Sequence, residues 1–159
     1  MELYILRHGI AEDGSGIRDE DRELTPRGRD ELCALLRLAA RGRVQPSLIL
    51  TSPLVRAVQT AEIAALEFRY KGELLGTDTL IPEADPWDFW SELRLHRDQP
   101  AVLLASHNPL CSRLPGFLLS CPAMQVHFDK GAMARIDLDR LGAEPRGVLR
   151  WMLTPRFAH

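Results

Sequence analysis

The first nine residues read MELYILRHG (residues 1–9), a short apolar run that ends in an Arg-His-Gly triplet. Two more apolar runs of similar length occupy residues 48–50 and 101–105. Short continuous apolar runs are typical of strands that are buried on both faces of a parallel sheet. Later strands are predicted at residues 126–128, 134–138 and 148–153. We therefore expect a central, largely parallel sheet.

Four helices are predicted between these strands, and all share one start signal. They span residues 26–40, 53–66, 86–97 and 109–119. In the first, Leu32, Leu35, Leu36 and Ala39 recur at the spacing of one buried helix face. Each helix opens with a capping side chain followed by proline, which favours a helix N-terminus: Thr25-Pro26, Ser52-Pro53, Asp85-Pro86 and Asn108-Pro109.

Strands and helices alternate along the chain, and no linker or repeat divides it. This order predicts a three-layer α/β/α sandwich with a mostly parallel central sheet, in a single domain over residues 1–159. The most polar stretch, residues 14–22, is expected to be a surface loop. In such folds ligands bind beyond the C-terminal ends of the parallel strands.

The composition is that of an ordinary globular protein, with 45% hydrophobic residues, 26% charged residues and a net charge of −2. The balanced charge gives no general reason to expect nucleic acid or a membrane as a partner. No apolar run reaches the roughly 18 residues of a membrane span, and the N-terminus lacks the pattern of a signal peptide. Cys33, Cys111 and Cys121 form no metal or disulfide motif, so each is expected to be a small buried hydrophobe in a reduced, cytoplasmic protein.

Chemistry-bearing side chains follow three predicted strands. Arg7 and His8 follow the first, Arg56 lies shortly after the second, and His107 follows the strand at residues 101–105. Two of these segments lead into helix N-termini, whose free N–H groups attract anions. Arginine donates paired hydrogen bonds that match phosphate oxygens. The three strand ends together therefore predict a phosphate or phosphoryl site.

Each of these residues has an ordinary explanation when it is taken alone. A strand-end arginine can be a surface charge, a histidine can be a satisfied polar residue, and Ser-Pro or Asn-Pro can be only a helix start. What these explanations leave out is the coincidence at three ends of one sheet. A metal held by His8 and His107 is disfavoured, because metal sites need three or four ligands and seldom have arginines beside the cation.

The motifs Leu6-Arg7-His8-Gly9, Ser52-Pro53-x-x-Arg56-Ala57-x-Gln59-Thr60 and His107-Asn108-Pro109 resemble the histidine phosphatase superfamily, which includes phosphoglycerate mutases. The resemblance extends over essentially the whole chain. Within the superfamily, three further segments are similar to the small SixA-type phosphohistidine phosphatases. These are Arg22-x-Leu24-Thr25-x-x-Gly28, residues 131–136 and the Trp151-x-Leu153-x-Pro155 ending.

The resemblance implies that His8 is a nucleophile that becomes phosphorylated, with its other ring nitrogen held by backbone near Gly9. Arg7, Arg56 and His107 would surround the phosphoryl group and stabilise its charge. Arg22 either adds a further phosphate contact or is a plain surface arginine. The resemblance implies no cofactor and no metal.

A general acid is harder to assign from the residues. Larger family members present a carboxylate between the second strand and the second histidine, and here Glu83 and Asp85 lie in that segment. Asp85 is expected to cap the helix that follows it, which commits its carboxylate to backbone N–H groups. Glu83 is therefore the preferred proton donor. Ser106 replaces the more usual glycine before the histidine, and we expect little consequence.

The substrate is suggested by a missing insertion. Larger family members insert a helical cap between the two halves of the site, and residues 61–106 leave no room for a sizeable one. An open site can accept a phosphohistidine side chain on a protein, with inorganic phosphate as the product. The alternatives are a phosphatase for small phosphate esters and a non-catalytic module that binds phosphoproteins or anions. A mutase is disfavoured because no cap would retain an intermediate.

Overall fold

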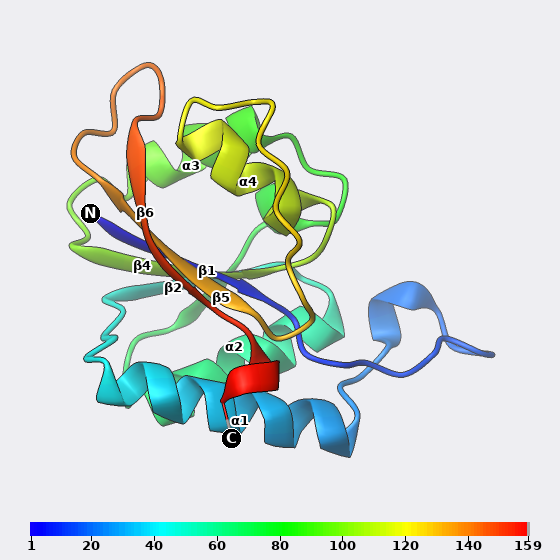
Figure 1. Cartoon of the computed structure of the whole chain (residues 1–159). Helices are drawn as coiled ribbons and strands as arrows, with labels where there is room; N and C mark the ends of the chain where they lie inside the picture. Colours follow the sequence, from blue (N-terminus) through cyan, green and yellow to red (C-terminus); the bar gives the residue numbers. More distant parts are fainter. Residues whose placement is uncertain (159) are drawn as a thin grey trace.

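A computed structural model describes residues 1–158 and shows a six-stranded sheet in the order β3-β2-β4-β1-β5-β6 (Figure 1). Strands β1, β2, β3 and β4 pair in parallel, whereas β5 runs opposite to both of its neighbours. The strands are β1 (Glu2–Arg7), β2 (Leu48–Thr51), β3 (Leu74–Gly76), β4 (Ala101–Ser106), β5 (Met133–Leu138) and β6 (Gly147–Leu153). The mostly parallel sheet predicted from the sequence is confirmed.

Helices cover both faces of the sheet and make the three layers expected. Helices α1 (Pro26–Arg41) and α2 (Val55–Glu67) lie on one face, and α3 (Pro86–Leu95) and α4 (Leu110–Leu118) lie on the other (Figure 1). Short 3₁₀ helices are η1 (Asp19–Asp21), η2 (Asp78–Leu80) and η3 (Pro155–Phe157). One apolar core fills each interface between helices and sheet, and the central strand β1 contributes to both because its side chains alternate between the faces. No large insertion covers the sheet edge between α2 and β4.

Two strand predictions need correction. Residues 126–128 form irregular chain, because this segment turns its backbone toward the Arg7 side chain, whose Nη1 donates to the Phe128 carbonyl at 2.6 Å. Phe128 itself is fully buried, which explains its apolar pattern without a strand. Strand β3 was not predicted, since it has only three residues and is largely exposed at the edge of the sheet.

The shared helix-start signal holds for two helices only. Thr25 accepts a hydrogen bond from Gly28 N–H at 3.0 Å, and Asp85 accepts one from Trp87 N–H at 2.8 Å. Helices α2 and α4 instead begin at Val55 and Leu110, and neither has a side-chain cap. The Ser52 hydroxyl contacts a histidine, and the Asn108 amide group contacts other parts of the chain.

The three cysteines lie in three different environments. Cys111 is fully buried, and burial raises the pKa of its thiol to about 12. Cys33 is half-buried, and Cys121 is exposed, so the expectation of burial is wrong for Cys121. Cys121 lies just beyond α4 in a turn that is open to solvent. In the part of the chain that the structure describes, no helix is both long and apolar enough to cross a membrane.

Candidate anion site at three strand ends

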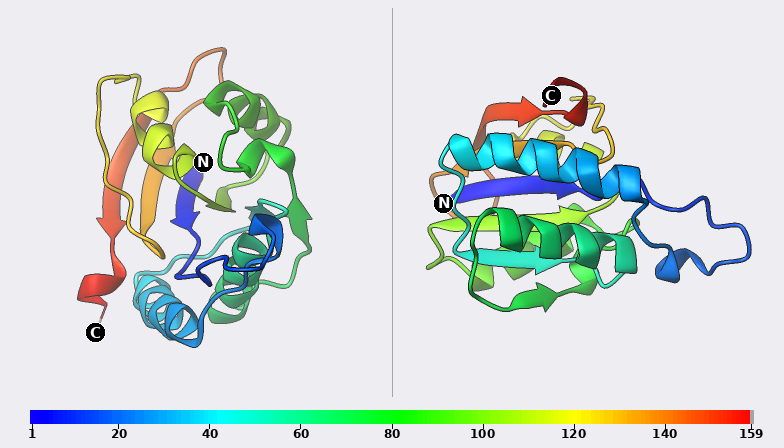
Figure 2. Two further views of the ribbon diagram at one scale, coloured as in Figure 1. Left: turned by 90° about the vertical axis from the view of Figure 1, so that its right-hand side faces the viewer. Right: turned by 90° about the horizontal axis from the view of Figure 1, so that it is seen from below.

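The register of the sheet brings the predicted site residues together. In β1 and β4, Arg7 lies directly beside Ser106, and in β2 and β4, Thr51 lies beside Ala105. The parallel strands β1, β2 and β4 therefore end at the same level. Their C-terminal ends face the viewer in the left panel of Figure 2. The next residues along these strands are His8, Ser52 and His107, all of them buried.

His8 is held by its own backbone. Its Nδ1 lies 2.7 Å from the Gly9 carbonyl oxygen, as predicted, which makes Nδ1 the protonated nitrogen and leaves the lone pair on Nε2. Gly9 packs closely against α1, because a Cβ there would lie 2.6 Å from Leu32 Cδ1 and 3.1 Å from the Gly28 carbonyl oxygen. The Gly9 N–H donates to Thr60 Oγ1 at 3.3 Å. The nucleophile candidate is thus fixed in one tautomer and one orientation.

His107 is held by a side chain. Its Nε2 lies 2.8 Å from Ser52 Oγ, and its Nδ1 is buried without a hydrogen-bond partner among the described residues. The rings of His8 and His107 have centroids 5.0 Å apart, close enough to serve one small group. Ser52 was predicted to be a helix cap, and nothing in the sequence alone marked its contact with His107.

Both arginines have a buried Nε atom without a partner within residues 1–158. Arg7 donates from Nη1 to the Phe128 carbonyl. Arg56 donates from Nη1 to the Asp19 carbonyl at 2.6 Å and from Nη2 to the Asp19 carboxylate at 3.1 Å. Four such buried, unpartnered nitrogens occur in this part of the chain, and three of them belong to Arg7, Arg56 and His107. Because buried polar groups are seldom left unsatisfied, their clustering indicates a site for an anionic ligand.

The electrostatics of the site favour neutral histidines and a bound anion. Burial lowers the pKa of His8 to about 3 against the opposing effect of its bond to Gly9, and the charges of Arg56, Arg7 and Lys130 lower it further. Burial, with His8 and Arg56 nearby, lowers the pKa of His107 to about 3. Near neutral pH, His8 therefore keeps the lone pair that a nucleophile needs.

Arg22 is linked to the anion site by the carboxylate of Asp19, which also contacts Arg56. Its Nε donates to the Glu12 carbonyl at 2.7 Å and its Nη1 contacts Asp19 Oδ1 at 2.9 Å. Asp19 in turn holds Arg56, so Arg22 and Arg56 bind opposite oxygens of one carboxylate. Hydrogen bonding to Arg22 and then to Arg56 lowers the pKa of Asp19. Asp19 is a residue that the sequence reasoning missed, since it lies in the polar loop that was expected to be only surface.

The two candidate acids lie outside this cluster. Glu83 is exposed, and its side chain makes no hydrogen bond or ion pair with any residue of the range 1–158. Asp85 caps α3 as expected. Ser106, to which no role was given, donates from its buried hydroxyl to the Leu80 carbonyl at 2.7 Å. This bond attaches the segment that leads to Glu83 to the end of β4.

The arrangement contains no metal-binding cluster. Within residues 1–158, no group of three or more His, Cys, Asp or Glu side chains is placed to hold a metal ion. The site instead presents one nucleophilic nitrogen beside several donors. That combination suits transfer of a phosphoryl group to nitrogen.

The family model described as histidine phosphatase superfamily (branch 1) matches residues 3–80. Phosphohistidine phosphatase SixA of Escherichia coli (strain K12) is 28% identical over 158 residues, which cover 98% of this chain and 94% of that protein. These matches show that the chain is similar to the histidine phosphatase superfamily. It is a hydrolase of the histidine-nucleophile class and is similar to the SixA type of phosphatase.

Solved structures agree with this assignment. The structure of the protein histidine phosphatase SixA complexed with tungstate has a TM-score of 0.88 and 28% identity, with 98% of each chain covered. A crystal structure from Agrobacterium tumefaciens that carries the SixA name has a TM-score of 0.82 and 26% identity, with 97% of each chain covered. Because almost the whole of each chain is covered, no large insertion distinguishes this fold from those two structures.

Proposed function

We propose that this histidine phosphatase removes the phosphoryl group from phosphohistidine in a protein, through a phosphorylated His8. One observation carries the proposal: three buried, unpartnered nitrogens of Arg7, Arg56 and His107 accompany the free Nε2 of His8. Together they offer donors for phosphoryl oxygens beside a nucleophile that is already in the required tautomer. Tungstate, a tetrahedral oxyanion like phosphate, is bound in the SixA structure of the same fold.

The reaction proceeds in two displacements at phosphorus. His8 Nε2 attacks, a new N–P bond forms, and the N–P bond to the substrate imidazole breaks. The departing imidazole takes a proton from solvent or from an acid of the enzyme. Water then attacks the phosphoryl group on His8, the N–P bond breaks, and inorganic phosphate leaves with His8 restored.

In this mechanism, the hydroxyl of Ser52 fixes the tautomer of His107. Its Oγ accepts from the Leu54 N–H at 3.4 Å, so its own hydroxyl proton is available to donate to His107 Nε2. Neutral His107 then carries its proton on Nδ1, the nitrogen without a partner. In this tautomer His107 donates to a phosphoryl oxygen, and Arg7 and Arg56 donate from their Nε atoms. Ser52 is therefore a positioning residue that acts through His107.

The substrate assignment rests on the open site and on the leaving group. The site has no capping insertion, so a phosphorylated side chain on a protein surface can reach it. Imidazole has an ordinary pKa of about 6.5 and leaves readily, whereas an alkoxide needs a positioned acid. Glu83, the preferred acid, is exposed and makes no hydrogen bond or ion pair with any residue of the range 1–158, which suits a reaction that depends little on it.

A phosphatase for small phosphate esters is the second candidate. Glu83 supports it, because the Ser106–Leu80 hydrogen bond ties its segment to the strand that delivers His107. In this case Glu83 would swing inward and protonate the alkoxide.

A comparison of substrates tests the two candidates. The enzyme is given a phosphohistidine protein, a phosphoserine and a phosphotyrosine peptide, and small phosphate esters, and kcat/KM is measured for each. We expect the highest value with phosphohistidine. A higher value with a small ester would favour the second candidate, and phosphoprotein binding without release of phosphate would point to a non-catalytic module.

A further inference from the structure

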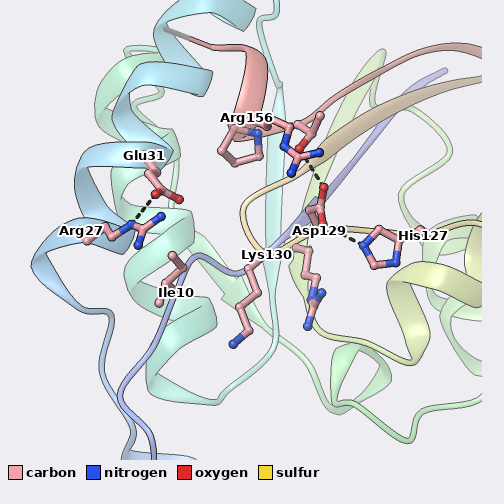
Figure 3. A pocket seen from close by; sticks show the side chains of 10 residues that line it. Ile10, Arg27, Glu31, His127, Asp129, Lys130 and Arg156 are labelled. Atoms are coloured by element: carbon pink, nitrogen blue, oxygen red, sulfur yellow. Dashed lines mark hydrogen bonds and ion pairs between the residues drawn. The ribbon is translucent and has the colours of Figure 1, made fainter.

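An open groove of about 750 Å³ lies beside the anion site, with Arg7 forming part of its wall (Figure 3). Its two sides come from the start of α1 and from the segments around residues 127–130 and 154–156. Its charged and ionisable lining residues are Arg7, Arg27, Glu31, His127, Asp129, Lys130 and Arg156. Apart from Arg7, the charged residues that line this groove take no part in the proposed chemistry.

The groove has more positive than negative charge, and its acids are already engaged. Glu31 pairs with Arg27 at 2.7 Å, and Asp129 accepts from His127 at 2.8 Å and from the Thr154 hydroxyl at 2.9 Å. Lys130 and Arg156 are exposed, and among residues 1–158 neither has a hydrogen-bond or ion-pair partner. The groove thus presents two cations that are available to an external anion.

A short turn links the groove to the nucleophile. Gly131 donates from its N–H to the His8 carbonyl at 2.9 Å and adopts a φ of 75°, in the left-handed region. This turn fixes Lys130 close to His8, near enough for its positive charge to contribute to the lowered pKa of that histidine. A phosphohistidine held at His8 would therefore have its neighbouring residues over the groove.

We propose that this groove binds the acidic surface that flanks the phosphohistidine on a substrate protein, with Lys130 and Arg156 contacting its carboxylates. The inference rests on the proposed function. Charge complementarity selects the occupant, because basic side chains attract acidic segments and raise the rate of encounter. A small phosphate ester or free phosphohistidine fills only the anion site and leaves the groove empty.

Two synthetic phosphohistidine peptides test the groove, one flanked by glutamates and the other by serines, with phosphoramidate as the small substrate. The variant K130A/R156A removes both free cations. Its control, K71A/R146A, makes the same change in charge at exposed residues near the opposite ends of the strands. We expect K130A/R156A to lower kcat/KM for the glutamate peptide by about three- to tenfold at low salt, with little effect on the serine peptide or phosphoramidate.

Two results would overturn the proposal that the groove binds an acidic surface. One is equal activity of the wild type and K130A/R156A on the glutamate peptide, and the other is an equal loss of activity in the control variant. A loss on all three substrates would also overturn it, because it would mean that the variant damages the anion site. Failure of the proposed function looks different: the wild type would then leave both phosphohistidine peptides intact. Added salt should reduce the preference of the wild type for the glutamate peptide.

Discussion

His8 and His107 are two buried histidines of similar exposure and similarly lowered pKa, yet they are held by opposite nitrogens. His8 is held at Nδ1 by a backbone carbonyl, whereas His107 is held at Nε2 by the hydroxyl of Ser52. A carbonyl can only accept, so it places the proton on Nδ1 of His8 and frees the Nε2 lone pair. A hydroxyl can donate, so it can leave His107 with a proton on Nδ1. In the proposed mechanism, these two partners set His8 to attack and His107 to donate.

The largest effect among the supporting residues is expected at Arg56. Arg56→Ala removes a buried donor and should cost about 2–4 kcal/mol of transition-state stabilisation, roughly 30- to 1,000-fold in kcat/KM. Asp19→Asn is the matched control, because it weakens the carboxylate contact and keeps the guanidinium. Kinetics on a phosphohistidine protein and thermal unfolding check the pair. An equal loss from both variants would mean that the loop, not the Arg56 charge, is what matters.

A smaller loss is expected at Ser52. Ser52→Ala removes one buried hydrogen bond to His107, so kcat should fall about tenfold. The ¹⁵N chemical shifts of His107 provide the readout that a purely structural role would not change. They should show the Nδ1–H tautomer in the wild type and a mixture in the variant, with Ser52→Thr restoring the wild-type pattern. An unchanged tautomer in Ser52→Ala would remove Ser52 from the mechanism.

At low pH, protonation of both rings should remove the difference in tautomer between the two histidines and should destabilise the fold. Both have a pKa of about 3 in the fold against an ordinary value of 6.5, so the unfolded chain binds more protons between these values. The free energy of unfolding is therefore unaffected by these histidines above about pH 6.5. It decreases as the pH falls from there toward 3, because protonation of the two histidines favours the unfolded chain. His107→Gln should make this decrease shallower in urea titrations at several pH values.

The smallest effect on phosphohistidine is expected at Glu83. Glu83→Gln should change phosphohistidine cleavage little, but it should lower ester hydrolysis ~10²–10⁴-fold if Glu83 is the acid. Asp85→Asn should leave both activities nearly intact, because an asparagine also caps a helix. Equal losses on both substrates from Glu83→Gln would refute the leaving-group explanation. A greater loss from Asp85→Asn would exchange the two assignments.

The sequence predicted well which residues lie together at the strand ends, because a strand end is a local feature. An apolar run followed by Arg7 and His8 defines both the strand and what its end presents, and the parallel order aligns that end with His107. The second motif likewise placed Arg56, since the helix after β2 begins close to its predicted start.

Contacts between distant segments could not be predicted in the same way. Ser52 and Asn108 look like helix caps beside their prolines, but the Ser52 hydroxyl contacts His107 and the Asn108 amide donates to the Phe128 carbonyl. Asp19 reaches Arg56 from a polar loop that has no regular pattern. Residues 126–128 have a strand-like composition because Phe128 is buried. Their backbone instead accepts a hydrogen bond from Arg7 at the Phe128 carbonyl. In each case the deciding partner lies far along the chain.

The identity of the nucleophile is tested most directly by trapping the phosphorylated enzyme. Enzyme mixed with substrate carrying a labelled phosphoryl group is quenched rapidly without acid, digested and mapped by mass spectrometry. We predict an acid-labile, alkali-stable label on Nε2 of His8, and we expect both the label and turnover to be lost in His8→Ala. Label on His107 or on a cysteine, or full turnover by His8→Ala, would contradict it.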